Sequence, residues 1–257
     1  MARESKKEKE TPKSRKALRR VALIVVGLGI CTGVSVYLVH RYLIHDPKFI
    51  LSHDRRDALA IDGLRYGSRA KVQRIFAEDT DHSVFSVPLD ERRRRLLAID
   101  WVQDAAVSRI WPDRLAVRVR ERKPIAFVEV QSTVMLIDAE GMLLEPPPQA
   151  QFTFPVLSGV RAEDPPERRM DAVRALLDVE DALGPAMKNV SEVNASDPSN
   201  IRIVVQMDSR VLELILGEDN LGSRYRNFVQ HYPEIRKRSP EVKRFDLRLD
   251  DRITARE

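Results

Sequence analysis

Cysteine is almost absent from this sequence: the only one among 257 residues is Cys31, inside an apolar run near the N-terminus. The rest of the chain therefore forms no internal disulfide, whatever its redox surroundings. We expect packed hydrophobic cores to stabilise the fold in place of covalent cross-links. The roughly 200 residues after the run are enough for one large domain or two small ones.

Patterns that carry catalysis or bind metals and cofactors are also missing. The sequence has no GxSxG, HExxH or CxxC motif and no GxxxxGK[ST] phosphate loop. Three of its five histidines, His40, His45 and His53, lie near one another, but they lack cysteine neighbours and the helical i, i+4 spacing of a metal site. We therefore expect no enzyme, no cofactor and no metal site.

Excess positive charge is confined to the N-terminal tail. Residues 1–20 hold nine Lys and Arg and three Glu, whereas the rest of the chain holds 35 basic and 36 acidic residues. A nucleic-acid-binding domain carries its basic residues on the folded surface, so we expect no nucleic-acid partner. The basic tail instead favours attraction to anionic membrane lipid and a cytoplasmic N-terminus.

Only one long hydrophobic run is present, from Val21 to Val39. As a helix its 19 residues span about 28 Å, close to the hydrocarbon thickness of a bilayer. The run continues into His40 and Arg41 and not into a small-residue cleavage site, so we expect the helix to stay attached. Within it, Gly29 and Gly33 form a GxxxG pattern, which either packs two membrane helices together or is incidental in a lipid-facing helix.

The following segment predicts a small α/β unit. A strand at 58–61 ends at Asp62 and Gly63, a helix follows Ser68 as N-cap, and a second helix begins near Asp90. Because consecutive residues fan around a helix, the four arginines 92–95 are interpreted as a solvated face and not as a phosphate site. Strands at 102–110 and 115–121 form a hairpin through a turn that contains Pro112.

This order of elements resembles the POTRA domain, and most closely the one in FtsQ/DivIB bacterial cell-division proteins. That family carries a pattern like PWVxxAxVxRxxPxxLxVxVxERxPxA, and this chain has DWVQDAAVSRIWPDRLAVRVRERKPIA from Asp100 to Ala126. Asp100 replaces the usual proline. We expect Trp101, Val102 and Val107 to cover the helices.

The second half predicts a mainly β domain with flanking helices. One helix is expected to start at Asp164 as N-cap with Pro165 at its first position, and another to run from about 221 to 236. The expected strands are 126–130, 133–137, 142–144, 190–194, 201–207, 211–216, 242–249 and 252–255.

This half is similar to the β domain of FtsQ/DivIB through FPVLSG at 154–159, LILGE at 214–218, SRYRNF at 223–228 and FDLR at 245–248. The resemblance covers Phe49 to Ile253. It implies an α+β protein with a single N-terminal transmembrane helix, a POTRA domain (β-α-α-β-β) and a mainly antiparallel β domain. The expected boundaries are a cytoplasmic tail at 1–20, a transmembrane helix at 21–39, a POTRA domain at 46–123 and a β domain at 124–257.

The resemblance also implies a function in septation. Proteins of this family belong to the divisome, bind the membrane-anchored coiled-coil proteins FtsB and FtsL through their terminal strands, and help to control septal peptidoglycan synthesis. The chain would then lie in the cell inner membrane at the division septum, with its C-terminal domains periplasmic or extracytoplasmic and its POTRA domain in contact with other divisome components. The residues expected to contact a partner are Phe245, Leu247, Arg248, Leu249, Asp251, Ile253 and Ala255.

Some alternatives remain open at this stage. The arginine of the family's DLR pattern pairs with an acid on FtsB, which maps to Arg248, but an arginine here can also form an ordinary surface ion pair. Leu249 replaces a tyrosine that the family can carry at the next position. A POTRA-containing translocation or outer-membrane assembly factor would use similar edge pairing, although this chain shows no repeat and no series of barrel strands. A cell-wall hydrolase would need a nucleophile and a base that no pattern here supplies.

Overall fold

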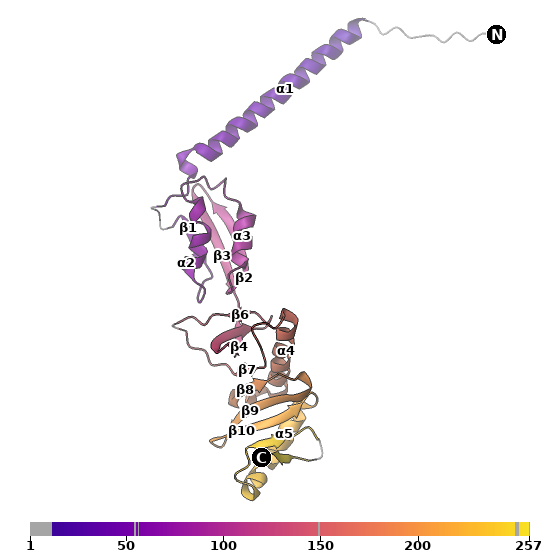
Figure 1. The fold of residues 1–257 in the computed structure, drawn as a ribbon. Helices are drawn as coiled ribbons and strands as arrows, with labels where there is room; N and C mark the ends of the chain where they lie inside the picture. Colours follow the sequence, from indigo (N-terminus) through magenta and orange to yellow (C-terminus); the bar gives the residue numbers. More distant parts are fainter. Residues whose placement is uncertain (1–11, 54, 56, 149, 250–251, 257) are drawn as a thin grey trace, which may run out of the picture. The chain divides into compact units, whose positions relative to one another are not determined.

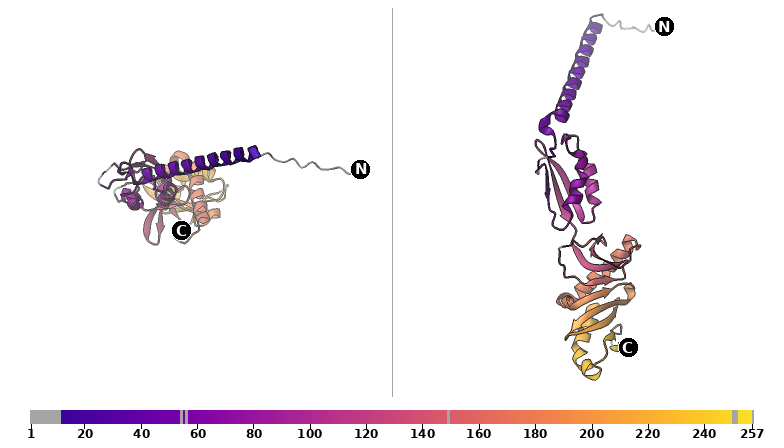
Figure 2. Two further views of the ribbon diagram at one scale, coloured as in Figure 1. Left: turned by 90° about the horizontal axis from the view of Figure 1, so that it is seen from above. Right: turned by 60° about the vertical axis from the view of Figure 1, so that its left-hand side comes forward.

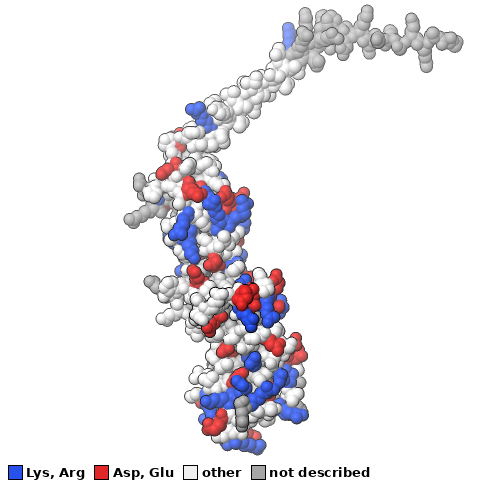
Figure 3. All heavy atoms as spheres, viewed as in Figure 1, with Lys and Arg blue, Asp and Glu red and all other residues white. Residues whose placement is uncertain are grey.

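Helix α1 (Pro12–His45) contains the predicted apolar run in the computed structural model, which describes residues 12–53, 55, 57–148, 150–249 and 252–256. The part of this helix at residues 20–45 is long enough and apolar enough to cross a membrane. Leu23 and Ile24 are 71% and 69% exposed, and Figure 3 shows a helix surface free of charge between its two ends. An apolar surface of this extent suits lipid better than water. Most of the basic tail, residues 1–11, lies outside the described residues.

After a short 3₁₀ turn, η1 (Pro47–Phe49), a three-stranded sheet and two helices follow in the predicted β-α-α-β-β order. The strands β1 (Leu59–Asp62), β2 (Val102–Ile110) and β3 (Arg114–Glu121) are arranged β1-β3-β2, and β1 is parallel to β3. The helices α2 (Arg69–Ile75) and α3 (Leu89–Leu97) lie on one face of this sheet (Figures 1 and 2). Leu115 and Val117 of β3 are fully buried, as the alternation of apolar residues predicts.

The glycine that follows β1 is required by the backbone. Gly63 has a φ of +84°, and a Cβ atom added there would lie 1.9 Å from the carbonyl oxygen of Val119. Only a residue without a side chain fits so close to β3 in this left-handed conformation.

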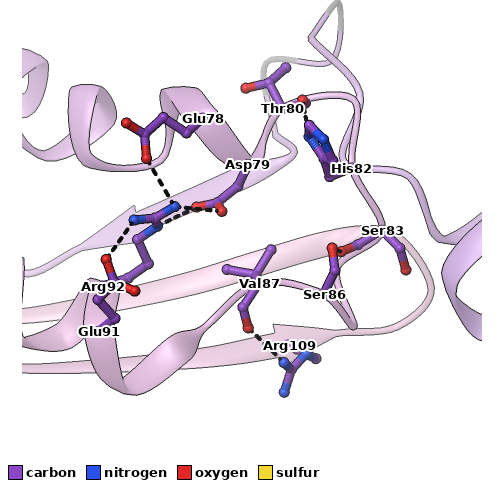
Figure 4. Close-up of polar contacts among 10 residues, drawn as sticks. All are labelled: Glu78, Asp79, Thr80, His82, Ser83, Ser86, Val87, Glu91, Arg92 and Arg109. Atoms are coloured by element: carbon purple, nitrogen blue, oxygen red, sulfur yellow. Dashed lines mark hydrogen bonds and ion pairs between the residues drawn. The ribbon is translucent and has the colours of Figure 1, made fainter.

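One of the four consecutive arginines of α3 is buried, contrary to the prediction that all four are solvated. Arg93, Arg94 and Arg95 are exposed, but the Arg92 side chain is only 6% exposed. Its Nε and Nη2 donate to the Asp79 carboxylate over 2.7 and 2.9 Å (Figure 4). These hydrogen bonds raise the pKa of Arg92 above its ordinary value, so the buried guanidinium stays charged.

Glu78 and Glu91 complete the environment of this cation. Glu78 accepts from Arg92 Nη2 at 3.4 Å, and Glu91 lies 3.5 Å from Nη1. Asp79 belongs to the 3₁₀ turn η2 (Ala77–Asp79), so the ion pair ties that turn to α3.

The second sheet has nine strands in the order β12-β11-β10-β9-β8-β7-β4-β5-β6. Most neighbours are antiparallel, whereas β10–β11, β4–β7 and β7–β8 are parallel. The mainly antiparallel domain of the predicted fold class is thereby confirmed. Its strands are β4 (Pro124–Val130), β5 (Thr133–Asp138), β6 (Leu143–Leu144), β7 (Val156–Ser158), β8 (Val190–Asn194), β9 (Ile201–Met207), β10 (Arg210–Gly217), β11 (Arg244–Asp246) and β12 (Thr254–Arg256).

Helices α4 (Pro166–Leu183) and α5 (Leu221–Arg238) cover one face of this sheet, and short 3₁₀ turns, η3 (Gly184–Asn189) and η4 (Pro198–Asn200), flank β8. The core contains alternate residues of β9 and β10, such as Ile203 and Leu214, together with Val179 of α4 and Phe228 of α5. These side chains are fully buried. Val211 of β10, by contrast, is 59% exposed on the uncovered face.

Two sequence expectations are corrected in this region. Helix α4 begins at Pro166 with Pro165 as N-cap, and the Asp164 carboxylate instead accepts the N–H of Arg161 at 2.7 Å. Trp101 does not simply cover the helices: it forms a buried cluster with Leu136 and Leu144, and its indole N–H donates to the Glu145 carbonyl at 2.9 Å.

By backbone contacts the chain divides into two compact units, which do not follow the two sheets. The described residues of Met1–Asp62, Ala70–Arg93 and Ala106–Arg118 form one, and those of Gly63–Arg69, Arg94–Ala105 and Val119–Glu257 form the other. The Trp101 cluster belongs to the second unit.

Candidate functional site

The last two strands of the nine-stranded sheet form the candidate site. Strand β11 lies between β10, to which it is parallel, and β12, to which it is antiparallel. Strand β12 has a neighbour on one side only, so it is an edge strand among the described residues. An edge strand presents unpaired N–H and C=O groups to an incoming chain.

The hydrogen bonds of β11 determine which residue of β12 faces outward. Glu213 donates its N–H to the Lys243 carbonyl at 2.8 Å, and Leu247 donates to the Ile215 carbonyl at 2.9 Å. Because bonding directions alternate along a strand, Phe245 also directs its backbone groups toward β10. Its register partner on β12 is Ala255. The N–H and C=O of Ala255 therefore point away from β11, toward the open edge.

Phe245 and Leu247, two of the residues expected to contact a partner, are core residues. They are 1% and 2% exposed, and the Phe245 ring lies 5.0 Å from the ring of Phe228 and 6.4 Å from that of Tyr232. These contacts hold β11 against helix α5. Any role of the two residues in binding is therefore to position the edge and not to contact a partner directly.

Arg248, the basic residue of the DLR pattern, is paired within the chain. Its Nε and Nη2 donate to the two oxygens of Asp246 over 2.9 and 2.7 Å, and Arg256 Nη2 lies 2.8 Å from Asp246 Oδ2. Hydrogen bonding from Arg248 is the main cause that lowers the pKa of Asp246 below its usual value, so this largely buried carboxylate stays ionised. One acid thus links the end of β11 to β12, while 41% of the Arg248 side chain remains exposed.

Leu249 is 54% exposed and borders a groove of about 440 Å³ next to α5. Ile253, which also lines the groove, is half-buried and packs against the core, and Ala255 is exposed. Asp251 lies outside the described residues. The groove is lined by Asn220, Ser223, Arg224, Asn227, Leu247, Leu249, Arg252 and Ile253.

Sequence analysis did not identify Asp246 and Arg256 as parts of this site. Asp246 had a usable signal, because residues two apart on a strand point to the same side and Asp246 precedes Arg248 by two. No signal in the sequence indicates the position of Arg256, since it lies beside Asp246 only because of the register of β12. No group of three or more His, Cys, Asp or Glu residues in the described part of the chain is arranged to hold a metal ion.

The membrane-helix pair Gly29 and Gly33 faces open space: a Cβ atom added at either position meets nothing within 4 Å. A role of these glycines in helix pairing stays a prediction.

Comparison with known proteins gives the same assignment for both halves. A family model described as FtsQ-type POTRA domain matches residues 57–122, and a model for the C-terminal region of cell division protein FtsQ/DivIB matches residues 126–248. The cell division protein FtsQ of Koribacter versatilis is 36% identical over 248 residues, which cover 93% of this chain and 71% of that protein.

More distant relatives carry the same name. FtsQ of Streptomyces bingchenggensis is 31% identical over 163 residues (62% of this chain, 60% of that protein), and FtsQ of Coxiella burnetii is 25% identical over 229 residues (89% and 87%). The solved extracytoplasmic domain of DivIB from Geobacillus stearothermophilus aligns with 47% of this chain and 95% of its own length, at 20% identity and a TM-score of 0.27.

Proposed function

The chain belongs to the FtsQ/DivIB family of cell division proteins, and from this premise we propose that it is a bitopic membrane scaffold of the divisome. It binds FtsB- and FtsL-like coiled-coil partners through the open edge of β12 and thereby helps to control septal peptidoglycan synthesis. The observation that carries the proposal is the outward-facing backbone of Ala255 on a strand with one neighbour. Strand addition to such an edge gains affinity from backbone hydrogen bonds and specificity from nearby side chains.

The proposed topology places residues 1–20 in the cytoplasm, a membrane helix at 21–39, and the domains 46–123 and 124–257 on the far side of the membrane. The basic tail supports this orientation, and the length and apolar surface of α1 support the span. The ends of the two matched family models, at 122 and 126, support a domain boundary between them.

The proposed role is binding and not catalysis. Arg248 and Arg256 carry positive charge at the border of the edge, and Leu249 adds an apolar contact beside the groove. An extended partner segment with an acidic residue and a small apolar residue would match these features. Positive and negative residues are mixed on the face of the folded part that Figure 3 shows, which supports a protein partner over nucleic acid.

Replacing Ala255 with proline tests the edge directly. Proline removes the outward N–H of residue 255 and leaves the pairs Asp246–Thr254 and Arg244–Arg256 in place, because an edge strand tolerates proline where its N–H faces outward. We expect the affinity for the FtsB-like partner of the same organism to fall at least about fivefold, since a partner carbonyl left unpaired costs about 1–3 kcal/mol.

Ala255→Val is the matched control, because it keeps the N–H and suits a strand. Full-length proteins in detergent would be titrated with labelled partner. Equal affinity of the proline and valine variants would exclude strand addition at this position.

A fluorescent fusion of the full chain tests the proposed location. We expect a band at mid-cell that appears before constriction, because a divisome scaffold is recruited to the septum. The Ala255→Pro variant should still reach the membrane, since α1 is unchanged. An even outline of the cell envelope for the unaltered fusion would contradict a role at the septum.

A further inference from the structure

Four aromatic rings form a cluster beside the C-terminal end of the membrane helix. The ring of Phe49 contacts Tyr42 of α1 with centroids 5.6 Å apart, Phe85 at 5.2 Å and Trp111 at 5.2 Å, all edge to face. Phe85 and Trp111 complete the cluster at 6.0 Å. Trp111 belongs to the tight turn between β2 and β3, so the tip of this hairpin packs against the segment that leaves the membrane helix.

Tyr42 places this cluster at the level of the lipid headgroups. The uncharged run ends at Val39, and three further residues of helix advance about 4.5 Å along its axis, into the interfacial zone where tyrosine and tryptophan are enriched. A hydrogen bond fixes the neighbouring loop to the same turn of α1, because Ser83 Oγ donates to the Leu43 carbonyl at 2.7 Å.

The hairpin tip and the 83–87 loop are further joined by Arg109 of β2. Its Nε donates to the Val84 carbonyl at 2.6 Å, and its Nη2 donates to the Val87 carbonyl at 2.9 Å (Figure 4). The tip of the hairpin, the loop and the end of α1 are therefore connected by hydrogen bonds. Trp111 has a defined position and does not hang on a free loop.

Trp111 is the solvent-exposed member of this aromatic cluster. Phe49 is only 2% exposed, whereas Trp111 is 65% exposed. An indole that is packed on one side and open on the other costs solvation free energy in water. A bilayer interface removes that cost, since the ring body lies among the upper acyl chains while the N–H reaches the headgroups.

The charges around the cluster complement lipid phosphate. Arg41 lies one residue before Tyr42 and Lys48 one residue before Phe49, and both are exposed. Long basic side chains near the end of a membrane helix reach the phosphate groups of the interface.

We propose that the tip of the β2–β3 hairpin is a second membrane contact, in which Trp111 inserts into the interface of the leaflet from which α1 emerges on the far side of the membrane. The occupant of the open aromatic face is the phospholipid interface itself. This inference depends on the proposed membrane insertion of α1, and it assigns to the hairpin a contact that the strand-addition function does not require.

The full chain in phosphatidylcholine nanodiscs tests this proposal through its two tryptophans. A Trp101→Phe variant leaves Trp111 as the only indole, and a Trp111→Phe variant leaves Trp101, which is 6% exposed and serves as the matched control. Each is measured in plain lipid and in lipid brominated on the upper acyl chain, where bromine quenches indoles that lie in the interface. Far-ultraviolet circular dichroism checks that both variants fold. The difference in emission between the unaltered chain and the Trp111→Phe variant gives the contribution of Trp111 a second time. This value does not depend on the Trp101→Phe variant.

We expect the Trp111 emission to be blue-shifted and to lose most of its intensity in brominated lipid, while Trp101 is little affected. Quenching by iodide in the aqueous phase but not by bromine would show Trp111 in water and overturn the proposal. Protection from both quenchers would place Trp111 against protein, from a second copy or another partner, and would overturn it equally. Incorporation into the nanodiscs reports the span of α1 separately, so failure of the helix and failure of the hairpin contact are distinguishable.

Discussion

Replacing Asp79 with alanine should lower the free energy of unfolding of the membrane-proximal sheet region by about 3 kcal/mol. The change leaves the buried Arg92 guanidinium without the carboxylate that accepts two of its hydrogen bonds. Removal of one partner from a buried pair costs about 3–5 kcal/mol. We expect the lower end because Glu78 and Glu91 remain within 3.4 and 3.5 Å of the guanidinium.

Hydrogen exchange of segment 70–110 in increasing urea, followed by mass spectrometry on the full chain, would measure this locally. The control is Asp171→Ala, whose cost is measured in the same way by exchange of segment 166–183, because Asp171 pairs with Arg174 on the surface of α4 and both side chains are more than half exposed. An exposed pair of this kind contributes under about 1 kcal/mol. A cost for Asp79→Ala no larger than that of the control would refute the view that the Arg92 pair is structurally critical.

A double variant distinguishes the net contribution of the Asp79–Arg92 ion pair from the cost of leaving one buried charge unpaired. Asp79→Leu combined with Arg92→Met replaces two buried charges with apolar groups of similar volume, which is often neutral or stabilising. We expect the double variant to recover most of the stability that Asp79→Ala loses.

Truncation of the chain after Arg248 should abolish co-purification with the FtsB-like partner and leave membrane anchoring intact. The deletion removes β12 with the outward-facing Ala255, the exposed Leu249 and the half-buried Ile253. It retains Phe245 and Leu247, whose burial against α5 holds β11 in the sheet. The truncated domain should therefore keep its core.

The new edge after truncation is β11, which does not reproduce the lost surface. Asp246 would lose Arg256, one of its two basic neighbours, and would present a carboxylate at the edge. Co-purification would be measured from membranes that contain both proteins, and exchange protection of β9 and β10 would report the core. Undiminished co-purification with an intact core would place the partner elsewhere on the chain.

The long elements were predictable because their periodicity is strong. The strands β2, β8 and β9 begin and end where the alternation of apolar residues predicts. The three-residue strand β7 carries too few residues for any period, so its place between β8 and β4 depends on tertiary pairing.

The error at Arg92 has a traceable cause. Leu89, Arg92 and Leu96 follow i, i+3, i+7 spacing, so Arg92 lies on the apolar side of α3. The four consecutive arginines were interpreted together as one solvated face, so the buried position of Arg92 was not recognised. Nothing in the sequence indicates that Asp79 is its ion-pair partner. The outward direction of Ala255 was equally hidden, because it follows from strand register and bonding direction. The sequence shows which residue types occur at 245–255, but not which of these residues are exposed to solvent.

The opposite edge of the nine-stranded sheet, strand β6, is poorly suited to strand addition. Strand β6 has only two residues, and three prolines, Pro146 to Pro148, follow shortly after it and offer no N–H. The proposed strand addition is therefore confined to the β12 edge, where we expect one incoming polypeptide for each copy of this domain. A sheet that can be extended at one edge only does not propagate into a fibre.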